Sequence, residues 1–376
     1  MTKTNFIPAS ILIIGSGSLY SIHQKLFKKR TNHILFAHLP HMVFAAVLAL
    51  GKIFRPCRCL LAFAIFTSLS APTALAQEAL MTDYAAAKAE AAKTGKDIFL
   101  AFTGSDWSES CGKLIKESLS QKDFRAAVGE HFVLLQLDFP EKENPLINPK
   151  VKAQNKEISE EYAVNGYPTI YLCDAKGLPY AQTGYIVDSD EPYQTHVNDL
   201  RTIRDVRDKA FKTLIETDSP AKAKSLISAL EAMELDSELI SRFYGDVLDQ
   251  IKKSDPTDTH GYLRKISGQY EMSQFNKKIN SYTDVGGENA EKILAIVDKA
   301  LANKDLTAEQ KQDILITRIL VFYHQGHFNE AIKVLEETLV LSPESEPARY
   351  LQKIKTEILK ERDAHDKKKS EKSGGN

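Results

Sequence analysis

Cysteine and tryptophan are scarce in this chain of 376 residues, which contains four cysteines and one tryptophan. Cys57 and Cys59 lie within the first 76 residues, so only Cys111 and Cys173 remain in the rest of the chain. Two thiols allow at most one internal disulfide. Their pairing matters if the protein is exported, because disulfides persist in oxidising compartments.

Acidic residues are absent from residues 1–76, which contain eight Lys and Arg residues. Arg55 and Arg58 precede a short apolar run at 60–71, and a small-x-small triplet ends at Ala76. This order of a basic region, an apolar core and a cleavage triplet is typical of a secretory signal. We therefore expect 1–76 to be a leader that is cleaved after Ala76, and the protein to be periplasmic or extracellular.

A retained membrane anchor is the alternative reading of the leader. No apolar run in it reaches the ~20 residues that a spanning helix needs. Joining the runs at 42–50 and 60–71 would bury three basic residues, which is costly. Contact with a membrane is therefore expected only if the leader stays uncleaved. Met42 is an alternative start, because the leader is unusually long.

Basic residues do not dominate the part of the chain that follows the leader. The eight basic residues of 1–76 leave 41 Lys and Arg against 50 Asp and Glu in 77–376, a net charge of about −9. Such a balance argues against a nucleic-acid partner. The length of this part suggests two domains, which we place at 77–190 and 191–361.

Residues 77–190 read as alternating helices and strands. Short apolar runs predict buried strands, and the turn signal at 174–177 predicts a hairpin. Asp83 and Gly95 are suited to begin and end a helix. The expected strands are 97–103, 131–139, 169–173 and 178–183, the expected helices are 84–93, 107–120 and 156–163, and 141–155 is expected to be a loop.

Everything from about residue 191 to 361 is expected to be helical. The predicted segments, separated by Pro, Gly or Asp-Pro breaks, are 193–216, 220–232, 236–253, 260–280, 288–302, 307–325, 328–341 and 345–361. The stretch 307–345, with Gly326, Ala331 and Pro343 at fixed offsets, resembles one tetratricopeptide repeat. Such a region either packs as a bundle or offers a partner-binding groove. The polar residues 362–376 are expected to be a disordered tail.

Two motifs about sixty residues apart carry the chemistry. The first is the sequence FTGSDWSESC at 102–111, between a strand and a helix, and the second is VNGYPT at 164–169, entering a strand. Together they resemble the thioredoxin superfamily, and more narrowly exported bacterial thioredoxin-like proteins with an F-T-G-S-D-W-C-x-W-C motif. The resemblance implies an α/β thioredoxin-like domain, followed here by an all-α, tetratricopeptide-like region.

The resemblance also assigns roles at the first motif. The first cysteine of a C-x-x-C pair attacks a disulfide as a thiolate at a helix N-terminus, and the second resolves the mixed disulfide. Ser108 stands in the place of the attacking cysteine and is better suited to cap the helix. Cys111 matches the resolving cysteine and is left as a monothiol. The chain is thus oxidoreductase-like without the usual attacking thiol.

Further positions follow from the same resemblance. A cis proline at Pro168 is expected to let the preceding residue offer its backbone to an extended substrate, so Trp107, Tyr167 and Pro168 form the expected substrate groove. The buried acid of many thioredoxins would fall at the apolar Ala101 or Phe102. Glu109 places a negative charge beside the thiol, which disfavours a thiolate.

Cys173 is not expected to restore a dithiol. It lies five residues beyond Pro168 along a strand, about 16 Å at ~3.3 Å per residue, which exceeds the ~7 Å limit between bridged Cα atoms. A buried apolar role suits it better. His324 and His327 lack a clustered third ligand, so we expect neither a metal nor another cofactor.

Two functional hypotheses remain open on the sequence. In the first, the protein binds a polypeptide or thiol partner through the groove, with weak or absent monothiol exchange at Cys111. In the second, it is a non-catalytic scaffold that acts through its helical region.

Overall fold

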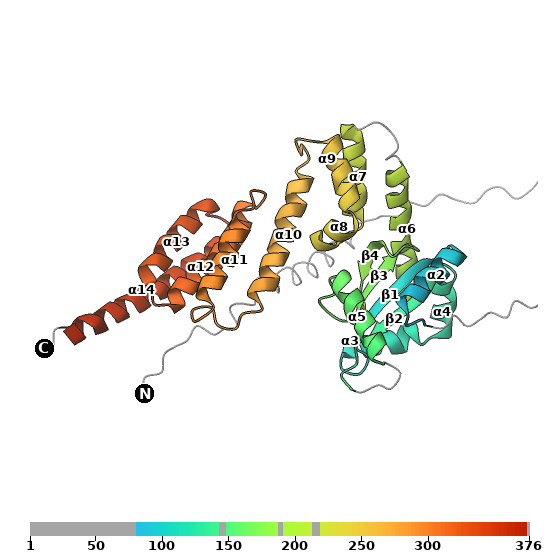
Figure 1. Cartoon of the computed structure of the whole chain (residues 1–376), viewed down its shortest axis with the longest axis horizontal. Coiled ribbons are helices and arrows are strands. Elements are labelled where there is room, and N and C mark those ends of the chain that lie inside the picture. Colours follow the sequence, from blue (N-terminus) through green and yellow to red (C-terminus); the bar gives the residue numbers. More distant parts are fainter. Residues whose placement is uncertain (1–79, 143–147, 187–190, 213–218, 374–376) are drawn as a thin grey trace, which may run out of the picture. The chain divides into compact units, whose positions relative to one another are not determined.

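The computed structural model describes residues 80–142, 148–186, 191–212 and 219–373 (Figure 1). The chain divides into two units, Met1–Ala76 and Gln77–Asn376. The leader and its cleavage after Ala76, which the sequence predicts, lie outside the described residues. In the described ranges, no helix combines the length and the apolarity needed to cross a bilayer.

Four strands form one mixed sheet in the order β2-β1-β3-β4. Strand β1 pairs in parallel with β2 and antiparallel with β3, and β3 pairs antiparallel with β4. The strands are β1 (Asp97–Thr103), β2 (Phe132–Asp138), β3 (Thr169–Cys173) and β4 (Pro179–Thr183). All four strands predicted from the sequence are therefore confirmed.

Both faces of the sheet are covered by helices. The side chains of β1 alternate, so that Phe99 and Ala101 pack with α3, η2 and α4, whereas Ile98 and Leu100 pack with α2 and α5. This burial on both faces explains why β1 is an uninterrupted apolar run. The helices are α2 (Tyr84–Thr94), α3 (Glu109–Leu114), the π-helix η2 (Ile115–Leu119), α4 (Lys122–Gly129) and α5 (Pro149–Glu161).

The start of α5 corrects the sequence prediction. Residues 149–155 were expected to lie in a loop because of their prolines, but α5 begins at Pro149. Proline is tolerated at the first position of a helix, where its missing N–H has no partner to lose. The Asn148 side chain caps this helix by accepting a bond from the Val151 N–H at 3.0 Å.

The C-terminal part of the chain is helical, as predicted. It contains α6 (Tyr193–Lys212), α7 (Pro220–Ala232), α8 (Ser237–Phe243), α9 (Gly245–Ser254), α10 (Tyr262–Ile279), α11 (Ala290–Leu301), α12 (Ala308–His324), α13 (Phe328–Leu341) and α14 (Glu346–Ser373). The α/β thioredoxin-like domain followed by helices, expected from the sequence, is thus confirmed (Figure 1).

Helix α14 overturns part of the prediction for the tail. Residues 362–373 were expected to be disordered, but they continue α14 to Ser373. The segment is rich in the strong helix formers Lys, Arg and Glu and contains no Gly or Pro. Buried Leu351 and Ile358 anchor the preceding turns of the same helix.

Helices α12 and α13 form the helix pair expected at 307–345. Gly326 lies between them with φ of 75°, a left-handed conformation that glycine adopts without strain. Ala331 is fully buried where the pair packs, in one cluster with Ile319, Leu335 and Leu351.

A buried charged cluster joins the sheet to α6. Asp97, at the start of β1, is fully buried and accepts a hydrogen bond from the Tyr180 hydroxyl at 2.9 Å. The guanidinium of Arg204 on α6 also donates to Asp97, and that of Arg201 lies 3.5 Å away. Arg207, the next arginine along, pairs with Asp174 at 3.1 Å.

Candidate functional site

The first motif lies where β1 ends and α3 begins. Ser108 is the N-cap of α3, and its Oγ accepts a hydrogen bond from the Cys111 N–H at 3.3 Å. The same hydroxyl donates to the Tyr167 carbonyl oxygen at 3.4 Å. The two sequence motifs, some sixty residues apart, therefore meet at Ser108. The Tyr167–Pro168 peptide bond is cis.

Cys111 lies beneath this cap. Its side chain is fully buried, and its Sγ accepts a hydrogen bond from the Gly104 N–H at 3.3 Å. A thiol reacts as an accessible thiolate, so the folded structure shields Cys111 from a partner. Cys111 and Cys173 are both free, as expected from their spacing.

Cys173 belongs to the opposite face of the sheet. It is buried and donates from its Sγ to the Tyr162 hydroxyl at 3.8 Å. Burial raises the pKa of the Cys173 thiol. The predicted packing role of Cys173 is therefore confirmed.

Trp107 is the exposed member of the site. Its side chain is 45% exposed, and its indole Nε1 donates to the Phe139 carbonyl oxygen at 2.8 Å. The ring packs edge-on against Tyr167 with 5.5 Å between centroids, and the Phe139 ring lies 5.2 Å from that of Tyr167. Partial burial raises the pKa of Tyr167. We call Trp107, Phe139 and Tyr167 the aromatic surface.

Sequence reasoning missed Phe139 and two acids beside it. Asp138, the last residue of β2, accepts hydrogen bonds from the Thr103 hydroxyl at 2.7 Å and from the Ser105 N–H at 3.0 Å. The carboxylate of Asp106 accepts from the backbone N–H groups of 141 and 142. The sequence held one signal for these acids: Asp106 directly precedes Trp107, and Asp138 ends an apolar strand.

Glu109 points into solvent instead of toward the thiol. Its side chain is 85% exposed and pairs with Lys113 at 2.8 Å. This hydrogen bond and the charge of Lys113 lower the pKa of Glu109. Ala101 and Phe102 are buried apolar residues, and the fully buried acid of β1 is Asp97, at the other end of the strand.

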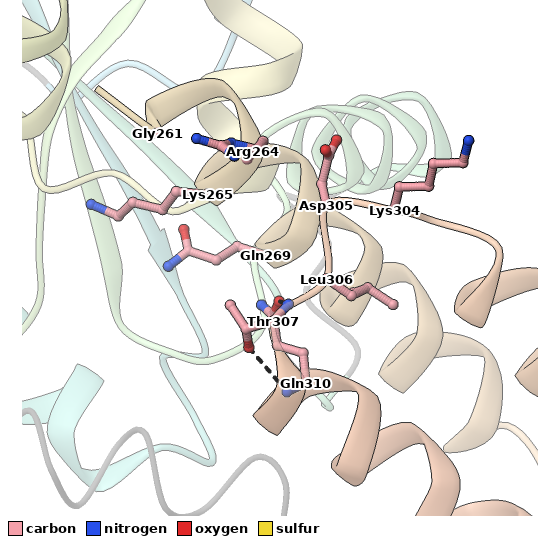
Figure 2. Close-up of a pocket in the computed structure, with 9 residues that line it drawn as sticks. All are labelled: Gly261, Arg264, Lys265, Gln269, Lys304, Asp305, Leu306, Thr307 and Gln310. Atoms are coloured by element: carbon pink, nitrogen blue, oxygen red, sulfur yellow. Dashed lines mark hydrogen bonds between the residues drawn. The ribbon is translucent and has the colours of Figure 1, made fainter. Parts of the chain in front are cut away.

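The structure offers a separate pocket between α10 and the start of α12, of about 430 Å³. Figure 2 shows that Arg264, Lys265 and Gln269 reach it from α10, and Thr307 and Gln310 from the start of α12. None of the residues predicted from the motifs lines it. His324 and His327 are not among its lining residues either, and within the described ranges no three His, Cys, Asp or Glu side chains are grouped to hold a metal ion.

Comparisons with known proteins place the fold in a family. A family model described as a thioredoxin-like domain matches residues 84–196. The disulfide bond reductase DsbH of Chlamydia pneumoniae is 31% identical over 122 residues, which cover 32% of this chain and 72% of that protein. A solved structure of a DsbH oxidoreductase is 28% identical and covers 34% of this chain and 88% of its own, with a TM-score of 0.30. The chain belongs to the thioredoxin-like family.

Proposed function

We propose that this chain is an exported thioredoxin-like protein that binds an extended polypeptide, itself carrying a thiol or disulfide, across Trp107, Tyr167 and Pro168. Disulfide exchange at Cys111 is weak or absent. The observation that carries the proposal is the contrast between a fully buried Cys111 and a Trp107 that is 45% exposed. A partner can therefore contact the Trp107 side chain, whereas the nearby thiol of Cys111 is not accessible to it.

The chemistry of Ser108 supports weak exchange. In the full reaction a thiolate attacks a disulfide sulfur of the partner and one partner thiolate leaves, which gives a mixed disulfide. A second thiol of the same protein then attacks the first cysteine, forms an internal disulfide and releases the partner's other thiolate. The Ser108 hydroxyl cannot form a thiolate. It accepts a hydrogen bond from the Cys111 N–H at the helix start and donates one to the Tyr167 carbonyl oxygen. Cys111 alone can form a mixed disulfide, but among the residues that the structure describes it has no neighbouring thiol to resolve it.

Two further observations support the partner class and the compartment. The similar Chlamydia pneumoniae protein is named a disulfide bond reductase, which favours a partner with a thiol or disulfide. The acid-free leader with its cleavage triplet at Ala76 favours export.

A thiol titration tests the proposal. In denaturant the protein that starts at Gln77 should react at Cys111 and Cys173, whereas in its native state both thiols should react far more slowly, because both are buried. Cys111→Ser and Cys173→Ser assign each signal. Fast, stoichiometric labelling of native Cys111 would show an active monothiol and contradict weak exchange.

A second experiment asks whether the groove is otherwise intact. Ser108→Cys restores two thiols at the C-x-x-C positions and should create dithiol reduction of a protein disulfide, with Ser108→Ala as the inactive control. A folded Ser108→Cys variant without activity would mean that more than the attacking thiol has been lost.

The scaffold hypothesis keeps one observation in its favour. At the end of α13, Val340 is 77% exposed and Leu341 is 41% exposed. Exposed apolar side chains of this kind mark interaction sites when they gather in a patch. Partner capture that depends on these two residues and not on Trp107 would favour the scaffold.

A further inference from the structure

Three consecutive residues of the first motif bond to the last residue of β2 and to the segment that follows it. The Ser105 hydroxyl donates to Asp138 at 2.6 Å, and the Trp107 indole donates to the Phe139 carbonyl oxygen at 2.8 Å. Between them, Asp106 accepts from the Glu141 N–H at 3.0 Å with one carboxylate oxygen and from the Lys142 N–H at 2.8 Å with the other.

Asp106 binds backbone N–H groups that lie outside the β-sheet. Strand β2 ends at Asp138, so the N–H groups of Glu141 and Lys142 lie beyond the last residue of the ladder. An ionised carboxylate has acceptor positions on both oxygens and can bind both groups at once. These N–H groups, that of Lys142 first, keep the pKa of Asp106 below its usual value, so the carboxylate stays ionised at neutral pH.

The held segment forms part of the aromatic surface. Its first residue, Phe139, supplies the acceptor for the indole of Trp107 and a ring that packs against Tyr167. Movement of 139–142 would therefore release the indole from its hydrogen bond and open the gap between Trp107 and Tyr167.

We propose that Asp106 is a positioning residue, which holds residues 139–142 in place so that Trp107 is presented to a polypeptide partner edge-on to Tyr167. The polypeptide partner in this inference rests on the proposed function, whereas the positioning of Trp107 rests on the geometry alone. Asparagine is a poor substitute, because its amide has one acceptor oxygen and turns an N–H group toward the second backbone N–H.

The single tryptophan makes the positioning measurable. Trp107 is the only source of indole fluorescence in the chain, so its emission and its quenching by acrylamide report on this site alone. In Asp106→Ala we expect emission at longer wavelength and quenching increased by up to about twofold, since the side chain is 45% exposed at the start. Asp106→Asn should fall between this variant and the wild type.

Asp83→Ala is the matched control. Asp83 is likewise an exposed carboxylate that accepts a backbone N–H, that of Ala86 at 2.9 Å, but it caps α2. This variant should leave the fluorescence unchanged. Wild-type emission and quenching in Asp106→Ala, or an equal change in Asp83→Ala, would overturn the positioning role.

Binding is then measured separately under reducing conditions, with an unfolded protein that keeps its free thiols as the probe. Asp106→Ala should bind it at least several-fold more weakly than Asp83→Ala. A wild-type chain that fails to bind the probe contradicts the proposed function, while the fluorescence still decides the role of Asp106. A variant with displaced Trp107 and undiminished binding would overturn the link between positioning and partner.

Discussion

The two ends of strand β1 are built in opposite ways. At its first residue, Asp97 is fully buried and accepts bonds from the Tyr180 hydroxyl and from Arg204 on α6. Beyond its last residue the chain turns to Trp107, which is 45% exposed and held by one indole hydrogen bond and ring contacts. The buried charged contacts thus lie at the end of β1 far from the site, and the exposed aromatic side chain lies beyond the other end.

The largest expected effect is at the buried end. Asp97→Ala removes the carboxylate that accepts hydrogen bonds from Tyr180 and Arg204. The buried Tyr180 hydroxyl and the partly buried Arg204 guanidinium then both lose this acceptor. We expect the free energy of unfolding to fall by about 3 kcal/mol, measured by urea denaturation. A loss below about 1 kcal/mol would show that the charged cluster adds little and would remove the contrast between the two ends.

The next effect concerns binding at the exposed end. Trp107→Ala should weaken binding of the unfolded-protein probe by about 2 kcal/mol or more, because half-exposed aromatic anchors carry much of the energy of an interface. The double variant Val340→Asp, Leu341→Ser should bind like the wild type. Calorimetric or fluorescence-anisotropy titration checks both, and the reverse pattern would favour the scaffold hypothesis.

A smaller, pH-dependent effect is expected at the junction of β4 and α6. His196 lies 2.9 Å from the Thr183 hydroxyl, and burial lowers its pKa below the usual 6.5. The unfolded chain therefore binds this proton more readily, so stability is present above pH 6.5 and is lost as the pH falls through the lowered pKa. In His196→Gln, the urea midpoints of unfolding at pH 7 and at pH 5 should differ less than they do in the wild type. If the midpoint shifts equally in both proteins, His196 does not contribute to the pH dependence of stability.

The smallest effect is expected on the solvent-facing side of α3. Glu109→Gln breaks an ion pair with Lys113 whose side chains are 85% and 48% exposed. Such pairs add little because water and salt screen them, so stability and probe binding should both stay unchanged. A clear loss of binding would place Glu109 in the recognition surface.

Local patterns predicted most of the sheet. The boundaries of β1 and β3 follow from apolar runs that are buried on both faces, and α2 follows from its Asp83 cap and its Gly95 end. The start of α5 was not predicted, because Pro149 is a breaker inside a helix and a good first residue of one. Sequence spacing alone does not separate those two cases.

The site was predicted where its residues belong to one of the two motifs, and the family resemblance brought those motifs together. The capping role of Ser108 follows from its position before a helix. The roles of Asp138 and Phe139 depend on the parallel pairing of β1 with β2, which sets Thr103 opposite Asp138. Contacts between residues some thirty positions apart carry no periodic signal, so they became visible only in the folded chain.

The central position of β1 also constrains how this protein can be synthesised. Its partners lie in β2 and then in β3, and the arginine that neutralises Asp97 follows 107 residues later. A chain that leaves the ribosome or a translocation channel N-terminus first has its middle strand long before it has either neighbour. The sheet can therefore form only after β3 has emerged, and the buried Asp97 meets Arg204 later still, once α6 has followed.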